Sequence, residues 1–337
     1  MSLLNVAVWG LGSHAINRIL PAIFSMNEIK LIGVCSRNNK VVKACAEQWN
    51  CHGWNKSDHM LKSAKVDVVY IATPIGVHYA CAEQALKAGK HVWCEKPLTC
   101  NYADTKKLVS LAEVENKVLT ESFMYLYHPQ FHRVKKFVEN SKIVHSVICR
   151  FGIPNLDKPG FRNNPELCGG ALWDIATYTT SALFAIFPGQ QVKVIFAEVL
   201  TKKKSRVDTE GRALLRFSQG ATVYIEWGLG ISYRNEIDLW SEESTFFTNK
   251  IFSKPKGYQP QYEIRDLNGN KSIESGERCE QFTEMFRAFF RIMGDQEKIA
   301  AERKIISFHG SGNVEITIWV PLSISELSTA IIPKTSD

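Results

Sequence analysis

The feature that most constrains the fold is a glycine-rich turn between an apolar strand and a helix, close to residue 10. Leu3 to Trp9 is typical of a buried strand, Gly10-Leu11-Gly12-Ser13-His14-Ala15 follows it, and apolar residues at helical spacing continue to Ile23. The first glycine makes the tight turn, the second lets a pyrophosphate approach the backbone, and Ala15 keeps the helix close to the sheet. The helix N-terminus then faces the phosphates. The segment predicts a dinucleotide-binding fold whose cofactor contacts include Gly10, Gly12, Ser13 and His14.

The second strand predicts which dinucleotide is bound. It runs from Ile29 to Cys35 and ends at Ser36-Arg37, where an acidic residue would bind the ribose 2′-hydroxyl of NAD. This chain has a hydroxyl and a planar guanidinium there, and both suit a 2′-phosphate. We therefore predict NADP(H) in preference to NAD(H). The alternative is that Arg37 is only the first polar residue before the next helix.

A third strand brings further polar residues to the same edge. Val66 to Ala72 is a continuous apolar run, as expected of a parallel strand buried on both faces. It ends in Thr73-Pro74, and His78 opens the next helix. Ligands of open parallel sheets bind at the carboxyl ends of the strands, so we expect all three residues in the cofactor site. His78 alternatively caps the helix, and it has no partners at metal-ligand spacing.

The stretch AGKHVWCEKPL, Ala88 to Leu98, ends another strand with a carboxylate, an ammonium and a proline. Pro97 restricts Lys96 to extended geometry, so the lysine is aimed from the strand end. We predict that Glu95 and Lys96 enter the site; the alternative is an exposed turn with a solvated ion pair. One more helix and a strand ending at Glu121 complete a doubly wound parallel sheet of the Rossmann type, in a predicted domain of residues 1–122.

Beyond Glu121 the alternation of strands and helices stops. Alternating polar and apolar segments predict a mostly antiparallel sheet in a second, α+β domain of residues 123–337, so the overall class is α/β. The expected strands are 144–151, 193–200, 211–217, 221–227, 235–240 and 262–266, and a last helix is expected over about 280–293.

A second motif, GGALWDIATY, opens a long apolar helix at residue 169. Asp174 and Tyr178 are four residues apart and share one face, with Ser181 one turn further. This polar stripe is either a solvent-exposed face or the border of a cleft, and the apolar residues around it favour the cleft.

These motifs together resemble the glucose–fructose oxidoreductase/inositol dehydrogenase (Gfo/Idh/MocA) family, over about residues 4 to 295. Within it, the segments 123–131, 169–178 and 249–260 are most similar to the sugar-nucleotide 3-ketoreductases of deoxysugar biosynthesis. The resemblance implies a Rossmann domain followed by an α+β domain with a large, mostly antiparallel open sheet that often forms dimers. The sequence departs from the family pattern in two places. After about residue 300 the family's last amphipathic helix is missing from the sequence, and at Tyr178 many relatives have histidine.

The resemblance also implies roles for individual residues. Lys96 and Tyr178 become catalytic residues, with Asp174 in support, and all three contact the substrate. The further implied cofactor contacts are Arg162 and Trp173, and the further implied substrate contacts are Tyr125, His128 and Tyr258. Ordinary sheet packing is the alternative for Tyr258.

The predicted reaction is NADPH-dependent reduction of the 3-keto group of a nucleoside-diphosphate-linked deoxyhexose, with dTDP as the expected carrier. Hydride transfer to a ketone requires a proton donor and stabilisation of the developing negative charge. The hypothesis is that Tyr178 donates the proton, while Lys96 polarises the carbonyl and lowers the pKa of Tyr178. The alternatives are an NAD(P)-dependent dehydrogenase of a free sugar, inositol or trans-dihydrodiol, and a non-catalytic NADPH-binding regulatory protein.

Composition narrows the class of protein further. The chain has 337 residues, a net charge of +7 and scattered lysines, so a small anionic ligand is favoured over nucleic acid. Nine cysteines without a CxxC pair predict free thiols, no metal site and a reducing cytoplasm. No signal-like segment or apolar run of membrane-spanning length occurs, so no membrane partner is expected. We expect a homodimer or homotetramer formed through the second sheet.

Overall fold

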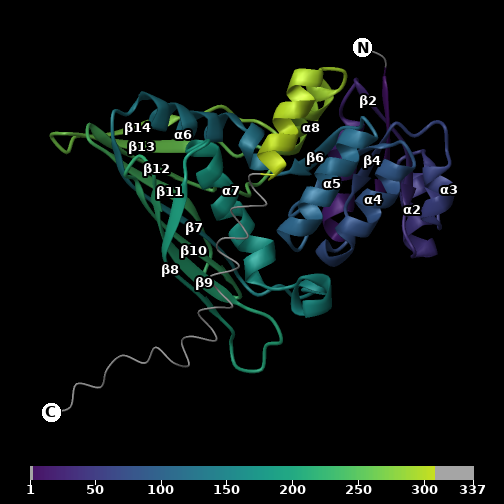
Figure 1. Ribbon diagram of the computed structural model, residues 1–337, viewed down its shortest axis with the longest axis horizontal. Helices are drawn as coiled ribbons and strands as arrows, with labels where there is room; N and C mark the ends of the chain where they lie inside the picture. Colours follow the sequence, from purple (N-terminus) through teal and green to yellow (C-terminus); the bar gives the residue numbers. More distant parts are fainter. Residues whose placement is uncertain (1–2, 308–337) are drawn as a thin grey trace.

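The computed structural model describes residues 3–307 and contains two sheets, one in each half of the chain (Figure 1). All six strands of the first sheet are parallel, in the order β3-β2-β1-β4-β5-β6. They are β1 (Leu4–Trp9), β2 (Ile29–Cys35), β3 (His52–Trp54), β4 (Val68–Ile71), β5 (His91–Glu95) and β6 (Leu119–Ser122). This confirms the predicted Rossmann sheet. The strand order reverses between β1 and β4, and the crevice at that point is where such sheets bind ligands.

Helices connect these strands, and two of them begin at an asparagine cap. They are η1 (Ala15–Ile19) running into α1 (Leu20–Phe24), α2 (Asn39–Gln48), α3 (Ser57–Leu61), the short η2 (Ile75–Val77), α4 (His78–Lys87) and α5 (Tyr102–Val114). Asn38 accepts a hydrogen bond from the Val41 amide, and Asn101 accepts one from the Asp104 amide. An asparagine at the N-cap satisfies a backbone N–H that lacks an intrahelical partner, which fixes the starts of α2 and α5.

The second sheet has eight strands in the order β14-β13-β12-β11-β7-β10-β9-β8. They are β7 (Val144–Ile153), β8 (Val192–Leu200), β9 (Glu210–Phe217), β10 (Thr222–Leu229), β11 (Arg234–Ser241), β12 (Ser244–Asn249), β13 (Gln261–Asp266) and β14 (Lys271–Ser275). Only the β7–β10 pair is parallel, so the mostly antiparallel prediction is confirmed. β12 and β14 were not expected, and every residue of β14 is exposed, so no alternation marks it.

The polar stripe of the GGALWDIATY motif lies in the interior. η6 (Leu172–Ala176) and α7 (Thr177–Ile186) follow each other, and α7 packs against β7, β10 and α6 (Pro129–Asn140). Asp174, Tyr178 and Ser181 are all buried, so the alternative of a solvent-exposed face is wrong. The remaining short helical turns are η3 (Met124–Tyr127), η4 (Gly160–Asn163) and η5 (Pro165–Leu167).

Helix α8 (Gln281–Ile292) returns to the first sheet (Figure 1, yellow). The ring centroids of Phe286 and Tyr70 lie 5.4 Å apart, and those of Phe286 and Trp93 lie 5.6 Å apart. Residues 296–307 are also helical, whereas the atypical tail from 308 lies outside the described residues. We keep the domain boundary between Ser122 and Phe123 as a proposal, with α8 covering the first domain.

A disulfide between Cys100 and Cys168 corrects the prediction of nine free thiols. Their Cα atoms are 6.2 Å apart, within the usual range for a bridge, although 68 residues separate them in sequence. An odd count and the absence of CxxC do not reveal which distant cysteines the fold brings together. The bond joins the loop after Lys96 to the loop before Asp174.

Two features are absent from residues 3–307. Among these residues, no helix combines the length and apolar character that crossing a bilayer requires. The same residues contain no group of three or more His, Cys, Asp or Glu side chains arranged to hold a metal ion.

Candidate active site

A cleft of 970 Å³ lies between the carboxyl ends of the parallel strands and the GGALWDIATY segment. Most of the predicted site residues line it: Gly10, Gly12, Ser13, His14, Ser36, Arg37, Thr73, Pro74, His78, Glu95, Lys96, Arg162, Asp174 and Tyr178. The two halves of the chain therefore contribute to one site, as the sequence motifs predict.

The glycine turn fits a bound pyrophosphate. Gly10 has a φ of +107°, and a Cβ there would lie 2.5 Å from the Ala72 carbonyl, so only glycine fits. At Gly12 a Cβ would meet nothing within 4 Å, which leaves open space beside the backbone of the turn. The helix begins directly after this turn, so its unpaired amides and its dipole favour an anion there.

The end of the cleft beyond Ser36 and Arg37 contains residues that the sequence analysis missed. Asn55, Lys56, Ser57 and Asp58 follow β3 and line the cleft together with Ser36 and Arg37. The signal was available, because these residues directly follow β3 and ligands of parallel sheets bind at the carboxyl ends of the strands. Lys56 adds a second cation to the end where Arg37 was expected to bind a phosphate.

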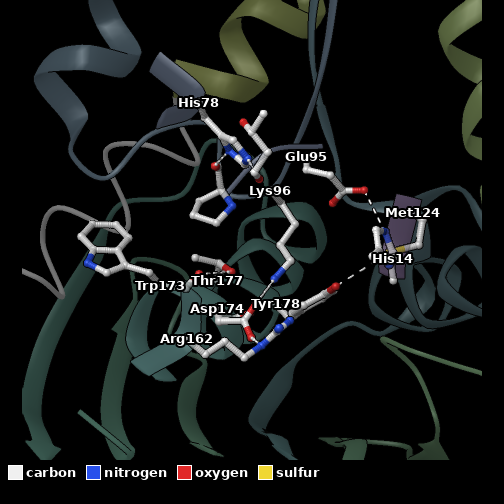
Figure 2. A network of polar contacts seen from close by, with 12 residues as sticks. His14, His78, Glu95, Lys96, Met124, Arg162, Trp173, Asp174, Thr177 and Tyr178 are labelled. Atoms are coloured by element: carbon white, nitrogen blue, oxygen red, sulfur yellow. Dashed lines mark hydrogen bonds and ion pairs between the residues drawn. The ribbon is translucent and has the colours of Figure 1, made fainter. Parts of the chain in front are cut away.

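Lys96 and Arg162 both bind the carboxylate of Asp174 (Figure 2). Lys96 Nζ donates to Asp174 Oδ1 at 3.1 Å and to the Asp174 carbonyl oxygen at 2.5 Å. Arg162 Nε donates to Asp174 Oδ2 at 2.5 Å. Burial opposes ionisation of Asp174, but the two cations outweigh it and hold its pKa below the usual range. The aspartate thus fixes the ammonium at the centre of the cleft.

Tyr178 lies beneath Lys96. The ammonium is 4.2 Å from the centroid of the phenol ring, and the Tyr178 hydroxyl contacts Met124 Sδ at 4.0 Å. Burial raises the pKa of Tyr178 well above its usual range; the carboxylates of Glu95 and Asp174 raise it further, and Arg162 opposes them. The expectation that Lys96 lowers the pKa of Tyr178 is therefore not met, because the hydrogen bonds of the ammonium go to Asp174.

Glu95 precedes Lys96 and binds the glycine turn. His14 Nε2 lies 2.9 Å from Glu95 Oε1, and the Tyr70 hydroxyl donates to the same oxygen at 2.5 Å. Burial disfavours the ionised carboxylate, yet the interactions with His14, Tyr70 and Lys96 keep the pKa of Glu95 below its ordinary value. Glu95, whose side chain is 14% exposed, is therefore an anion at the wall of the cleft.

His78 connects the ends of two strands. Its Nδ1 lies 2.8 Å from the Pro97 carbonyl oxygen, and its Nε2 lies 2.8 Å from the Thr73 carbonyl oxygen. Burial lowers the pKa of His78, whereas both carbonyls favour the charged ring. His78 lines the cleft, and its ring connects the backbone of Pro97, next to Lys96, to the backbone of Thr73.

Comparison with known proteins identifies the family. The protein-family model described as "Oxidoreductase family, NAD-binding Rossmann fold" matches residues 4–123, and the family model of the GFO/IDH/MocA C-terminal domain matches residues 131–246. The dTDP-3,4-didehydro-2,6-dideoxy-alpha-D-glucose 3-reductase of Saccharopolyspora spinosa is 31% identical over 75% of this chain and 77% of its own length. The chain belongs to the Gfo/Idh/MocA oxidoreductase family.

This Gfo/Idh/MocA member is also similar to two other relatives. The crystal structure of KijD10, a 3-ketoreductase from Actinomadura kijaniata in complex with TDP-benzene and NADP, has a TM-score of 0.85 and 26% identity. The match covers 94% of this chain and 97% of that chain. D-xylose 1-dehydrogenase (NADP(+)) 2 of Haloferax volcanii is 28% identical over 65% of this chain and 67% of its own length.

Four predicted contacts of this Gfo/Idh/MocA member do not line the cleft. Tyr125 is fully buried and its hydroxyl contacts Ser181 Oγ at 2.7 Å, while His128 is fully buried and caps α6 through Gln130. The Tyr258 hydroxyl donates to Asn249 Oδ1 at 2.6 Å, outside the cleft. The indole of Trp173 extends away from Lys96 (Figure 2).

Tyr125 and His128 are fully enclosed core residues, which corrects their predicted ligand contacts. Tyr258 lies in the loop between β12 and β13, and both Tyr258 and Trp173 are partly exposed, so their ligand contacts stay predictions. Aromatic side chains in a motif mark either a ligand surface or a core, and only the tertiary structure separates the two cases.

Proposed function

We propose that this protein is an NADPH-dependent reductase of the 3-keto group of a nucleoside-diphosphate-linked deoxyhexose, with dTDP as the carrier. The observation that carries the proposal is the convergence of Lys96, Asp174 and Tyr178 on the cleft that ends at the glycine turn. The relatives named for dTDP-sugar reduction support the substrate class.

The cofactor preference rests on the far end of the cleft. One hydroxyl and two cations line the cleft where β2 and β3 end, from Ser36, Arg37 and Lys56. Such a donor set suits a 2′-phosphate, and the NADP present in KijD10 supports the same preference. Gly10, Gly12 and the helix start would hold the pyrophosphate. When bound, the cofactor supplies the hydride.

The catalytic roles follow from charge and burial. Because the pKa of Tyr178 is raised, its hydroxyl keeps its proton at neutral pH and is available as a donor to a developing alkoxide. Lys96 brings a positive charge to the same point and stabilises that alkoxide. Asp174, itself neutralised by Arg162 and Lys96, orients the ammonium and does not exchange protons.

The test is turnover with a defined substrate panel. NADPH absorbance is followed with a dTDP-linked 3-keto-deoxyhexose, and NADP⁺ reduction is followed with free aldoses and inositols. We expect consumption of NADPH with the nucleotide sugar alone. Activity confined to free sugars would favour the dehydrogenase alternative, which the similarity to D-xylose dehydrogenase supports. NADPH binding without turnover on any compound would leave the regulatory alternative.

We also propose a homodimer formed through the outer face of the second sheet. Trp240 is 60% exposed on β11, and Ile195 and Phe196 are exposed on the edge strand β8. Exposed aromatic and branched residues on a sheet face favour association. Light scattering tests the assembly, and Trp240→Glu should shift it toward the monomer. The cytoplasmic location likewise stays a proposal.

A further inference from the structure

Tyr70 is a buried phenol beside the cleft that the proposed reaction does not use. It lies in β4, is 0% exposed and does not line the cleft. Its hydroxyl donates to Glu95 Oε1 at 2.5 Å, and its ring packs against Phe286 of α8. Burying a hydroxyl is costly unless it is hydrogen-bonded, and a bond to an ionised carboxylate is among the strong ones. The bond to Glu95 therefore determines where the phenol lies.

Within residues 3–307, the carboxylate of Glu95 accepts hydrogen bonds through one of its two oxygens. Oε1 receives both the Tyr70 hydroxyl and His14 Nε2, and no described residue donates a hydrogen bond to Oε2. Some side-chain atoms are both enclosed and without a partner, and Glu95 Oε2 is not one of them, so it is not enclosed. Glu95 lines the cleft. One oxygen is thus anchored and the other is accessible from the cleft.

The position of Glu95 indicates which part of a dinucleotide this oxygen would meet. On one side it binds His14 of the glycine turn, where the pyrophosphate is expected; on the other it precedes Lys96, which the proposed function assigns to the reacting carbonyl. In a dinucleotide, the unit between the pyrophosphate and the nicotinamide is a ribose. An anionic oxygen accepts from a ribose hydroxyl and repels a phosphate.

We propose that Tyr70 is a positioning residue for the cofactor: by fixing Glu95 Oε1 together with His14, it aims Oε2 at a hydroxyl of the nicotinamide ribose. The proposal rests on the proposed dinucleotide site. Tyr70 touches neither cofactor nor substrate and acts only through Glu95. Phe286 and Phe282 of α8, which pack on Tyr70 and His14, hold both donors in place.

The test measures NADPH binding to Tyr70→Phe between about pH 5 and pH 8, by nucleotide fluorescence in the absence of sugar substrate. Phenylalanine keeps the ring and removes the hydroxyl. We expect roughly tenfold weaker binding at neutral pH, because a hydrogen bond to a charged group is lost. Without this donor the pKa of Glu95 should also rise. As the pH is lowered, Glu95 then takes up its proton earlier, so NADPH binding to the variant should weaken at a higher pH than NADPH binding to the wild type. In turnover, the KM for NADPH should rise far more than kcat falls.

Tyr127→Phe is the matched control. Tyr127 packs against Phe289 of α8, with ring centroids 5.5 Å apart, and does not line the cleft. Its variant should bind NADPH as the wild type does at each pH. Glu95→Gln should bind weakly without the pH dependence.

The outcomes separate the two proposals. If Tyr70→Phe binds NADPH with the affinity and pH profile of the wild type, Tyr70 is only a packing residue. If the wild type binds no dinucleotide at all, the proposed function fails first. Should Tyr70→Phe not fold, Glu95→Asp replaces it, because the shorter side chain withdraws the carboxylate from Tyr70 but keeps its charge. An unchanged pH profile in that variant would overturn the role of the contact.

Discussion

The Lys96 ammonium lies over the face of the Tyr178 ring, 4.2 Å from its centroid, and donates its hydrogen bonds to Asp174. A cation over a phenol ring is attracted to it, more strongly when both groups are shielded from water. Lys96 is 8% exposed and Tyr178 9% exposed. The contact therefore holds together two predicted catalytic groups, one directly after β5 and the other on α7.

Tyr178→Phe should abolish most of the turnover while it keeps this packing. We expect kcat to fall by about 10²- to 10⁴-fold, the usual contribution of a positioned proton donor. The affinity for NADPH should change little, because phenylalanine preserves the ring beneath Lys96. Single-turnover NADPH oxidation measures the chemical step, with Tyr102→Phe, at the start of α5, as the control outside the cleft. Near-normal turnover would remove Tyr178 from the mechanism.

Lys96→Ala should also slow the chemical step, but with a second effect. It leaves Asp174 buried with Arg162 as its remaining ion-pair partner, so the pKa of Asp174 should rise. We expect kcat to decrease with the dissociation constant of NADPH largely kept. Parallel kinetic and binding titrations check this, and a variant that loses binding but not turnover would contradict it.

Arg37→Ala should change cofactor choice. The loss of a charge-assisted contact to a 2′-phosphate weakens NADPH binding by roughly 10- to 100-fold, whereas NADH affinity should stay within a few-fold. Equilibrium titration with both cofactors gives the ratio. Arg265→Ala, on β13, is the control for loss of one surface cation. Equal weakening of both cofactors would show that Arg37 does not read the 2′-phosphate.

His128→Asn should reduce acid sensitivity. Burial lowers the pKa of His128 to about 3, and the nearby charge of Lys254 contributes in the same direction. Its Nδ1 accepts the Gln130 amide at the start of α6. The unfolded chain takes up this proton near the ordinary value of 6.5, so stability falls as the pH decreases from 6.5 toward 3. Asparagine keeps the cap and does not titrate there. Urea unfolding at several pH values should show a flatter acid limb, and an unchanged limb would refute the assignment. His59→Asn, at an exposed position, is the control.

Glu302→Gln should have the opposite effect at higher pH. Burial, with a further contribution from Glu121, raises the pKa of Glu302 to about 8. The folded chain therefore holds a proton that the unfolded chain releases near 4.5, so stability falls as the pH rises from 4.5 to about 8. Glutamine removes this loss. Thermal unfolding should show a gain at pH 8 that the exposed control Glu297→Gln lacks, and no gain would argue against a buried carboxyl.

Much of the nucleotide-binding half was predictable because its signals are local. Each central parallel strand is buried on both faces and reads as an apolar run, and the turn at Gly10 is a contiguous motif. The spacing of Asp174 and Tyr178 likewise placed them on one face without tertiary information. Their convergence with Lys96 is seen in the structure, while their catalytic roles stay predictions.

What failed depended on distant partners. The side chains of Tyr125 and His128 were predicted to contact a ligand. In the structure Tyr125 contacts Ser181 of α7, and Gln130, two residues after His128, donates to Thr248 of β12. No local sequence pattern indicates these distant contacts. Cys100 meets Cys168 only through the packing of two loops. β14 is an exposed edge strand that owes its conformation to pairing with β13.

The return of α8 to the first sheet has a consequence for synthesis of the protein. On a ribosome the six-stranded sheet emerges first, yet the aromatic cover over Tyr70 and Trp93 is translated only after the whole eight-stranded sheet. The nascent nucleotide-binding half therefore waits with an apolar surface uncovered, and it becomes complete only once nearly all the other elements have left the exit tunnel.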